Sequence, residues 1–486
     1  MPDEPLLEAD DIQGNGLRGF DTNCLDLIGL KIDDAPAARA WLRALASSIA
    51  SLAYVHEYRQ RRTTNDPRAT TEVLFNVALS RYALDALGFD FREIGDGLFN
   101  VAMGRLAGVF GDRASDYVIG QDKANTPDVL LIAGSQDANA LTAASDTLIA
   151  GATGLRLIYR ERGEMLQGEV EHFGFRDGLS QVAARGSMPD GTPLNLRSMH
   201  PDDPFASTHA RPGQPLVWTG QFVFGYSTQT DDPLIEGPAF GAPWMRNGSL
   251  VVFRRLEQDV AAFRTFLRDA APALGISARA LGAQVVGRWE DGTPVSLRPD
   301  GPDAMLATDV LANNHFAFDG APAVRVMEGA VERTIAADPT DERGLRCPLF
   351  SHIRKVNPRN LPTDQGSGHH TLTTQMIRRG IPFGPRFGIG RDGEKRGLLF
   401  LAYQTSFTRQ FKVVNNLWMN NSAAPERDGE GHDLLVGQDP AGGERFGTYL
   451  DAQGNASARI ATMARFVIAT GGAFLFSPSR AFFSAL

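Results

Sequence analysis

Three side chains of different chemical type lie in short, distinctive segments of this chain. His352 lies in CPLFSHIRKVNPRN, and Arg378 follows it 26 residues later in IRRGIPF. Upstream, Asp177 lies in GFRDG. An imidazole can bind a metal ion, a carboxylate can carry a proton, and a guanidinium can stabilise negative charge that develops in a reaction. If the fold brings them together, they would form a metal site with a proton carrier and a fixed cation.

Each of these residues also has an ordinary structural explanation. Histidines are often surface or satisfied core residues, and Asp177-Gly178 is a common turn dipeptide. A zinc site fits poorly, because His369 and His370 are adjacent and lie in no HExxH segment. There is no GxSxG elbow, no Walker loop, and no GxGxxG after a predicted strand. The pattern that fits best is a single axial histidine on haem iron, with an acid and a cation on the opposite side.

Composition limits the class of protein. At 486 residues the chain is long enough for roughly two to four domains. Its hydrophobic content of 43% and charged content of 22% are typical of a globular protein. The net charge of −9, without any run rich in Lys and Arg, argues against nucleic-acid binding. The only cysteines, Cys24 and Cys347, form no CxxC motif, which favours a reducing compartment.

The first twenty residues, MPDEPLLEADDIQGNGLRGF, are acidic and contain neither a basic start nor an apolar core of a signal peptide. No apolar stretch approaches the length of about 18 residues that a membrane helix needs. We therefore expect a cytoplasmic protein that does not bind membranes. A secreted protein that had lost its signal peptide would have the same appearance.

The first half of the chain alternates apolar runs of strand length with segments of helical periodicity. Predicted strands cover residues 25–32, 72–78, 128–133 and 155–162. Predicted helices begin at residue 35 and cover 81–89 and 137–149. Strand, helix, strand, strand, helix, strand is the order of a ferredoxin-like unit, in which helices cover one face of an antiparallel sheet.

The second half repeats this order with longer insertions. Predicted strands cover residues 220–226, 249–253 and 397–403, and helices follow the last two. The element order therefore predicts an α+β protein with a duplicated ferredoxin-like fold, although no tight sequence repeat is present. We expect an N-terminal domain over residues 1–200 and a C-terminal domain over 214–486, separated by a loop rich in Pro, Gly, Asp and Ser. A second long loop is predicted at 358–368.

Three motifs, in this order along the chain, give it a family resemblance. GFRDG resembles the GxxDG motif of the dye-decolorizing peroxidases, a family of haem enzymes with a duplicated ferredoxin-like fold. HIRKVNPR is similar to the segment with the proximal histidine, and RRGIPFG to the segment with the distal arginine. DIQG near the start, VVGRWEDGTP and GLLFLAYQ also resemble family segments. The length resembles that of the longer members.

The resemblance implies a role for each of the three residues. His352 would bind the iron of haem b, iron protoporphyrin IX, from the proximal side. Asp177 would move a proton between the oxygens of hydrogen peroxide, and Arg378 would stabilise the charge that develops. Between the two adjacent arginines, the family spacing of five residues to the aromatic Phe383 favours Arg378 over Arg379. Carboxylic acids ionise near pH 4, so we expect an acidic working pH.

The resemblance also places Leu399 and Phe400, in the strand GLLF, on the apolar distal wall, and Arg354 near a haem propionate. The alternatives are a strand core for the first two and a solvated surface position for Arg354. The haem would lie in the C-terminal half. The partners would be hydrogen peroxide and organic reductants, and a homo-oligomer is compatible with the sequence.

The implied activity is reduction of hydrogen peroxide with oxidation of bulky donors, such as anthraquinone dyes and phenols, through a high-valent iron–oxo state. One competing hypothesis is a haem carrier or iron-release protein without peroxidase turnover. Such a protein would need only the axial ligand and an apolar pocket, so Asp177 and Arg378 argue against it. The other hypothesis is a structural or partner-binding α+β protein, in which the three motifs are turns and loop charges.

Overall fold

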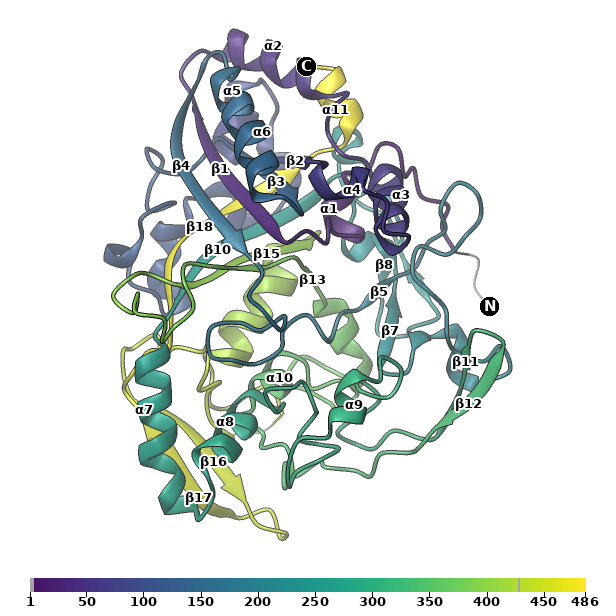
Figure 1. The fold of residues 1–486 in the computed structure, drawn as a ribbon, viewed down its shortest axis with the longest axis vertical. Helices are drawn as coiled ribbons and strands as arrows, with labels where there is room; N and C mark the ends of the chain where they lie inside the picture. The colour runs from purple at the N-terminus through teal and green to yellow at the C-terminus, as the bar shows by residue number, and fades with distance from the viewer. Residues whose placement is uncertain (1–3, 427–428) are drawn as a thin grey trace.

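In a computed structural model of the chain, which describes residues 4–426 and 429–486, half of the strands belong to two antiparallel sheets that meet edge to edge (Figure 1). The first three residues of the predicted N-terminal domain lie outside the described residues. The first sheet has the strand order β4-β1-β3-β2. Its strands are β1 (Cys24–Ile32), β2 (Leu74–Leu79), β3 (Val129–Ser135) and β4 (Leu155–Glu164). The helices α2 (Ala35–Leu45) and α6 (Ala138–Ala150) follow β1 and β3, as predicted.

The second sheet has the same order. Its strands are β10 (Ser249–Gln258), β13 (Ile377–Arg378), β14 (Ile381–Phe383), β15 (Gly397–Gln404) and β18 (Val467–Ser477). β18 pairs with β10, β10 with β15, and β15 with the two short strands β13 and β14. Helix α7 (Val260–Ala270) follows β10, and the π-helical segments Phe407–Phe411 and Val413–Met419 follow β15. If β13 and β14 are counted together as the second strand, β18 is the fourth strand of this sheet and pairs with its first, β10, as β4 pairs with β1. The predicted duplicated ferredoxin-like fold is therefore confirmed.

The two sheets join at both edges through single residue pairs. Leu79 of β2 pairs with Phe476 of β18, and Gly163 of β4 pairs with Phe383 of β14. Because β10 also pairs with β15, the strands close into a ring. The division into domains at residues 200 and 214 stays a prediction.

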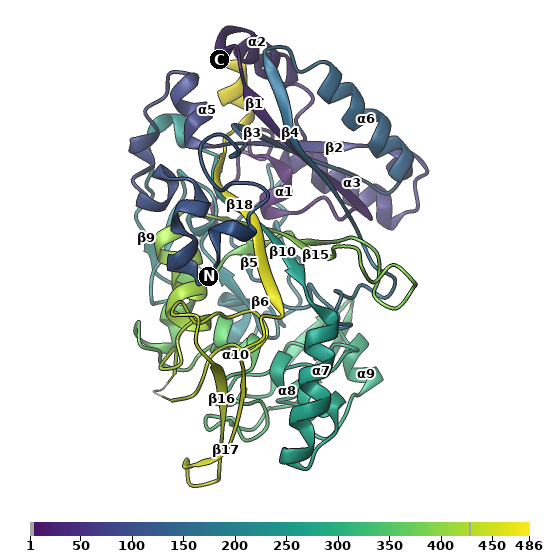
Figure 2. The ribbon, with the colours of Figure 1, turned by 90° about the vertical axis from the view of Figure 1, so that its left-hand side faces the viewer.

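The remaining elements lie in the connections between these strands, apart from one helix before β1 and one after β18. The other helices are α1 (Gly14–Leu17), α3 (Leu52–Thr63), α4 (Arg68–Thr71), α5 (Arg81–Ala86), α8 (Ala278–Val286), α9 (Ala304–Thr308), α10 (His352–Val356) and α11 (Arg480–Ser484). Short strands and hairpins are β5 (Ala183–Ala184), β6 (His209–Arg211), β7 (Gln214–Val217), β8 (Thr228–Gln229), β9 (Glu236–Gly237), β11 (Val324–Glu328), β12 (Val331–Ile335), β16 (Arg445–Leu450) and β17 (Ala456–Thr462). The β16–β17 hairpin projects from the end of the molecule opposite α2 (Figure 2).

The strand predicted at residues 220–226 is wrong. The segment begins in a 3-10 turn, Thr219–Gln221, and continues as further turns, although Phe222 and Phe224 are buried. A β-carbon at Gly220 would lie 2.2 Å from the carbonyl oxygen of Tyr226, so the chain doubles back on itself here. The apolar residues of this segment are buried, as a core strand would require. The backbone at Gly220 lies too close to Tyr226 for the segment to be extended.

Both faces of the sheets are covered, and the strand period separates them. Leu27 of β1 belongs to a hydrophobic cluster on one face, whereas Ile28 belongs to a second cluster that includes Leu42 of α2 and Leu141 of α6. In β15, Leu399 belongs to the first cluster, and Phe400 packs against the second. This alternation decides which residues of β15 can reach the site described next.

Candidate active site

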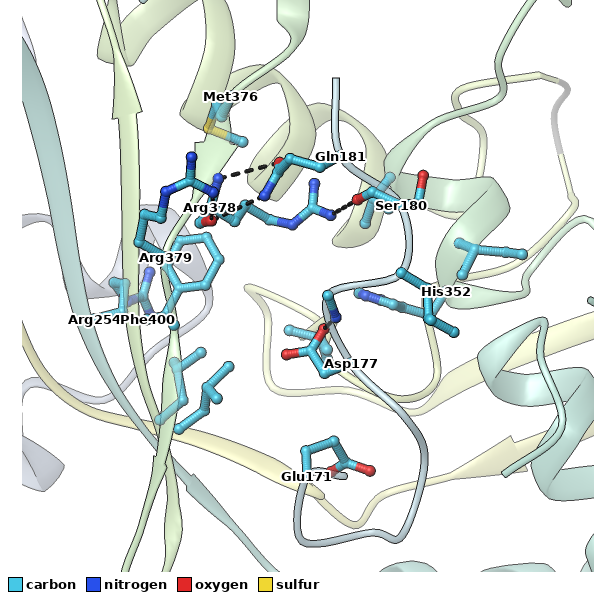
Figure 3. Close-up of a pocket in the computed structure, with 18 of the residues that line it drawn as sticks. Glu171, Asp177, Ser180, Gln181, Arg254, His352, Met376, Arg378, Arg379 and Phe400 are labelled. Atoms are coloured by element: carbon cyan, nitrogen blue, oxygen red, sulfur yellow. Dashed lines mark hydrogen bonds between the residues drawn. The ribbon is translucent and has the colours of Figure 1, made fainter. Parts of the chain in front are cut away.

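His352, Asp177 and Arg378 border one cavity of about 710 Å³. They come from α10, from the loop after β4, and from β13. Figure 3 shows Asp177 between Arg378 and Glu171, with Phe400 on one side of the cavity and His352 on the other. Three segments that are far apart in the sequence therefore supply an imidazole, a carboxylate and a guanidinium to a single space.

His352 is the first residue of α10, and a carboxylate fixes its ring through the nitrogen Nδ1. Its Nδ1 lies 2.6 Å from Oδ2 of Asp433, whose Oδ1 accepts hydrogen bonds from the backbone N–H groups of Leu435 and Val436. Burial lowers the pKa of His352, but the Asp433 carboxylate outweighs it and holds this pKa above its ordinary value. Because Nδ1 is engaged, Nε2 is the nitrogen left to bind a metal from the cavity.

Asp177 lies in a loop whose shape depends on the two glycines of its motif. Gly174 has φ +103° and Gly178 has φ +74°, values that a residue with a side chain rarely adopts. The N–H of Asp177 donates to the carbonyl of Glu169, and one oxygen of its carboxylate accepts from the N–H of Gly178 at 2.6 Å. The other oxygen has no hydrogen-bond partner among the described residues, and so remains free to exchange a proton.

Arg378 is tied to the loop that carries Asp177. Its guanidinium donates to the carbonyl of Ser180, and its backbone exchanges two hydrogen bonds with the side-chain amide of Gln181. Burial lowers the pKa of Arg378, and the negative charge of Asp177 opposes this shift. The arginine still remains a cation at neutral pH. Arg379, its neighbour, also borders the cavity but donates to the carbonyls of Asn15 and Leu17.

Glu171 is a second carboxylate on the cavity wall (Figure 3). Its oxygens accept the backbone N–H groups of Phe173 and Phe175 at 2.8 and 2.9 Å, and the amide of Gln258 also donates to it. Burial raises the pKa of Glu171 to about 7, although these hydrogen bonds favour the charged form. Its carboxylate closes the tight loop from residue 171 to 175 that leads into Asp177.

The expectation that Leu399 lines the cavity is wrong. Phe400 and Leu398 border the cavity, whereas Leu399 is 0% exposed in a hydrophobic cluster on the opposite face of β15. Successive residues of a strand point to opposite faces, so a pair on one face must be two residues apart. Leu398 and Phe400 therefore form an apolar part of the cavity wall, and Figure 3 shows Phe400 across the cavity from His352.

The expectation that Arg354 approaches a propionate is also wrong. Arg354 is 0% exposed, is absent from the cavity wall, and forms an ion pair with Glu426 at 2.6 Å. Its remaining N–H groups donate to the carbonyls of Asp341, Glu342 and Cys347. Residues two positions apart on a helix do not share a face, so a side chain two residues after His352 points away from the cavity. The surface alternative is wrong as well.

Two other arginines, Arg288 and Arg359, border the cavity, and neither has a carboxylate partner within hydrogen-bond distance among the residues that the structure describes. Both donate to the side-chain oxygen of Asn314, and Arg288 donates to Asn313 as well. Burial lowers the pKa of Arg288 to about 10 and that of Arg359 to about 9. Arg288 is buried and Arg359 is half-buried, and two such cations suit a ligand with two negative groups.

These residues fit haem. The cavity provides an imidazole fixed by a carboxylate, an apolar wall, and two arginines that could each receive a propionate. Within residues 4–426 and 429–486, no group of three or more His, Cys, Asp or Glu side chains could hold a metal ion. A metal on His352 would therefore need most of its ligands from a cofactor, as a porphyrin provides.

Sequence reasoning missed Asp433, Arg288, Arg359 and Leu398. Asp433 lies 81 residues from His352 in a segment without a motif, so no local signal identifies it. Arg288 lies in the GRW segment that already resembled the family, and Arg359 is the last residue of HIRKVNPR. Leu398 could have been found from strand alternation, because it precedes Phe400 by two residues.

Curated relatives match the chain over nearly its full length. It is 31% identical to a dye-decolorizing peroxidase of Exidia glandulosa, over 97% of this chain and 85% of the relative. It is 26% identical to a multifunctional dye peroxidase of an Amycolatopsis species, over 99% of this chain and 97% of that protein. No family model matches the chain. Among the described residues, none of the helices is both long and apolar enough to cross a membrane.

Solved structures of dye-decolorizing peroxidases are similar to this structure over nearly the whole chain. An ancestral D-type dye-decolorizing peroxidase superposes with a TM-score of 0.80 at 26% identity, covering 100% of this chain and 99% of the other. A dye-decolorizing peroxidase in complex with 2,6-dimethoxyphenol superposes with a TM-score of 0.78 at 25% identity, over 99% of each chain. The resemblance that three motifs predicted is thus confirmed by the whole sequence and by the fold. The chain belongs to the dye-decolorizing peroxidase family.

Proposed function

We propose that the chain binds haem b in the cavity, reduces hydrogen peroxide there, and oxidises bulky organic donors such as phenols and anthraquinone dyes. The observation that carries this proposal is the meeting of His352, Asp177 and Arg378 around one cavity. The donor class is supported by a solved relative in complex with 2,6-dimethoxyphenol. When bound, haem would supply an iron that takes up peroxide and stores two oxidising equivalents.

His352 would hold the iron through Nε2, and Asp433 would keep the imidazole electron-rich through Nδ1. Arg288 and Arg359 would each receive a propionate by charge-assisted hydrogen bonds. Leu398 and Phe400 would keep water from the opposite side, which strengthens every charge interaction there.

Asp177 would take a proton from the peroxide oxygen nearer the iron and return it to the outer oxygen, which leaves as water. Its carboxylate is suited to this role because one oxygen accepts from Gly178, while the other has no hydrogen-bond partner in residues 4–426 and 429–486. Arg378 would stabilise the negative charge on the separating oxygens, and its bond to Ser180 fixes its position relative to Asp177. We expect the loss of Arg378 to slow the peroxide reaction about a hundred- to thousand-fold.

Haem carriage without turnover, the alternative from the sequence, is not supported, because the relatives are peroxidases. A carrier would also have no use for a proton donor and a cation held together on the side opposite the axial ligand.

The test is an absorption spectrum of the haem-loaded protein before and after one equivalent of hydrogen peroxide. We expect the Soret band to change rapidly in the wild type and slowly in Arg378→Leu and in Asp177→Asn. Arg391→Leu is the matched control, since that arginine is exposed and pairs with Glu394 at the surface. Slow bleaching in the wild type would contradict the proposal, and so would the absence of any Soret band after haem is added.

A further inference from the structure

A group of arginines lies at the cavity beyond Arg378. Arg18, Arg59 and Arg379 all border the cavity, and we call them the arginine arm. Arg379 donates to the carbonyls of Asn15, Leu17 and Arg378, and Arg59 donates to the carbonyl of Arg18 at 2.9 Å. The arm is therefore continuous with the catalytic arginine and reaches back to the segment around α1.

The packing of this arm depends on a glycine. Gly19 has φ +78°, and a β-carbon there would lie 2.6 Å from Nε of Arg379. Any side chain at residue 19 would displace the guanidinium that links the arm to Arg378. The backbone thus leaves room for Arg379 at the point where the arm meets the catalytic part of the cavity.

The positive charge of the arm is not balanced. Arg59 lies 3.5 Å from Asp21, which also borders the cavity. This carboxylate is shared with Arg62, which lies 2.8 Å away and does not border the cavity. The guanidinium of Arg18 donates to the carbonyl of Leu194 at 3.2 Å, and its buried Nε has no hydrogen-bond partner within the described part of the chain. Burial, then repulsion from Arg59, lowers the pKa of both Arg18 and Arg379, the latter to about 9. The arm is a local excess of positive charge on a chain with net charge −9.

Solvent reaches this part of the cavity. Asp21 has 46% of its side chain exposed and Arg59 has 31%, and Met165, also on the cavity wall, is 42% exposed. Guanidinium groups pair with anions and stack on aromatic faces, so they suit a ligand that joins a negative group to an aromatic ring.

We propose that the arginine arm binds the sulfonate or carboxylate group of an anionic aromatic electron donor at the mouth of the cavity. A planar guanidinium matches a carboxylate or sulfonate through paired hydrogen bonds, and the partly exposed guanidinium of Arg59 is the one that an anion entering from solvent would reach. The proposal rests on the proposed function only in that it takes the anion to be the reductant. Binding of the anion itself is independent of turnover.

The first experiment measures binding of 2-naphthalenesulfonate, a probe that need not be oxidised, to the haem-loaded protein by calorimetry. Arg59→Gln is the informative variant, because this side chain is partly exposed and its loss removes charge without opening the core. We expect its dissociation constant to rise about tenfold, the low end for a charge-assisted hydrogen bond near the surface. Arg59→Lys keeps the charge and should restore most of the affinity.

Arg62→Gln is a closely matched control. Arg62 lies on the same helix, α3, pairs with the same Asp21 and has 30% of its side chain exposed, but it does not border the cavity. We expect its dissociation constant to change less than about twofold. Equal losses in both variants, or wild-type binding in Arg59→Gln, would overturn the proposal, because the effect would then be general surface charge or absent.

The second experiment compares kcat/KM for a sulfonated anthraquinone dye with that for the neutral 2,6-dimethoxyphenol. We expect the ratio of the two values to fall about tenfold in Arg59→Gln and to fall with added salt in the wild type. An unchanged ratio would contradict the role of the arm in donor selection. If no variant reacts with peroxide but the sulfonate still binds as described, the proposed function fails and the anion site stands.

Discussion

His352 and Asp433 lie 81 residues apart in the sequence, and Nδ1 of the imidazole lies 2.6 Å from the carboxylate in the fold. Asp433 is fully buried and is itself oriented by two backbone N–H groups. The carboxylate therefore fixes the direction of Nε2 as well as the charge of the ring.

Asp433→Asn should weaken the bond between His352 and the haem iron. An amide in place of the carboxylate leaves the ring less electron-rich, and a supporting residue of this kind is worth about 10- to 100-fold in affinity or activity. We expect the reduction potential of the bound iron to rise and the peroxide reaction to slow, measured by spectroelectrochemistry and stopped flow. Wild-type values for both quantities would show that Asp433 has only a structural role.

Arg288→Gln and Arg359→Gln should each weaken haem binding by about 10- to 100-fold, because each removes a charge-assisted hydrogen bond. The rate of haem transfer to an acceptor protein measures this loss directly. Arg279→Gln is the control, since Arg279 lies nearby in α8 but is 55% exposed and pairs with Glu290. Equal transfer rates in all three variants would mean that the two arginines at the cavity do not contact the cofactor.

Leu399→Ala should mainly lower stability, whereas Leu398→Ala should mainly change the absorption spectrum and the peroxide reaction. Leu399 is buried in a core cluster, so its truncation should cost about 2–5 kcal/mol of unfolding free energy and leave the Soret spectrum unchanged. Leu398 borders the cavity, and its truncation should alter the spectrum and the peroxide rate at a smaller cost in stability. Denaturant unfolding and absorption spectra of both variants test this, and the reverse result would contradict the strand alternation.

Glu171 should make stability depend on pH. Its folded pKa of about 7 lies above the unfolded value of 4.5, so the folded state holds the extra proton between these limits. Stability should therefore fall as pH rises from 4.5 to 7, by roughly 3 kcal/mol if no other group compensates. Glu171→Gln should lack this slope when both proteins are unfolded in denaturant in the same haem state. Glu290→Gln, which alters a surface pair with Arg279, should retain it.

The sequence predicted those parts of the site that are encoded locally. Asp177 was identifiable because the two glycines around it impose one loop shape, and His352 and Arg378 because their segments are short and distinctive. Asp433 was not, because its role arises only when the chain folds it against α10. The errors at Leu399 and Arg354 have a different cause. Both residues are close to a site residue in sequence, but strand and helix geometry turn them to the opposite face.

The fold was predictable for a similar reason. The strand and helix periods were clear for β1, β3, α6 and β15, and the order of these elements sufficed for the duplicated unit. The segment around Gly220 was misjudged because burial without alternation does not distinguish a strand from a packed turn. Ring closure through two single residue pairs depends on tertiary contacts that no local pattern encodes.

Those two pairs, Leu79–Phe476 and Gly163–Phe383, make the chain resemble a dimer whose subunits have been fused. Asp177 follows the last strand of one half, whereas Arg378 and His352 belong to the other. The acid and the cation thus face each other across what amounts to an interface between protomers. Neither half carries all three site residues, and the hydrophobic clusters include residues of both halves, so a change that altered the pairing of the two sheets would move Asp177 relative to Arg378.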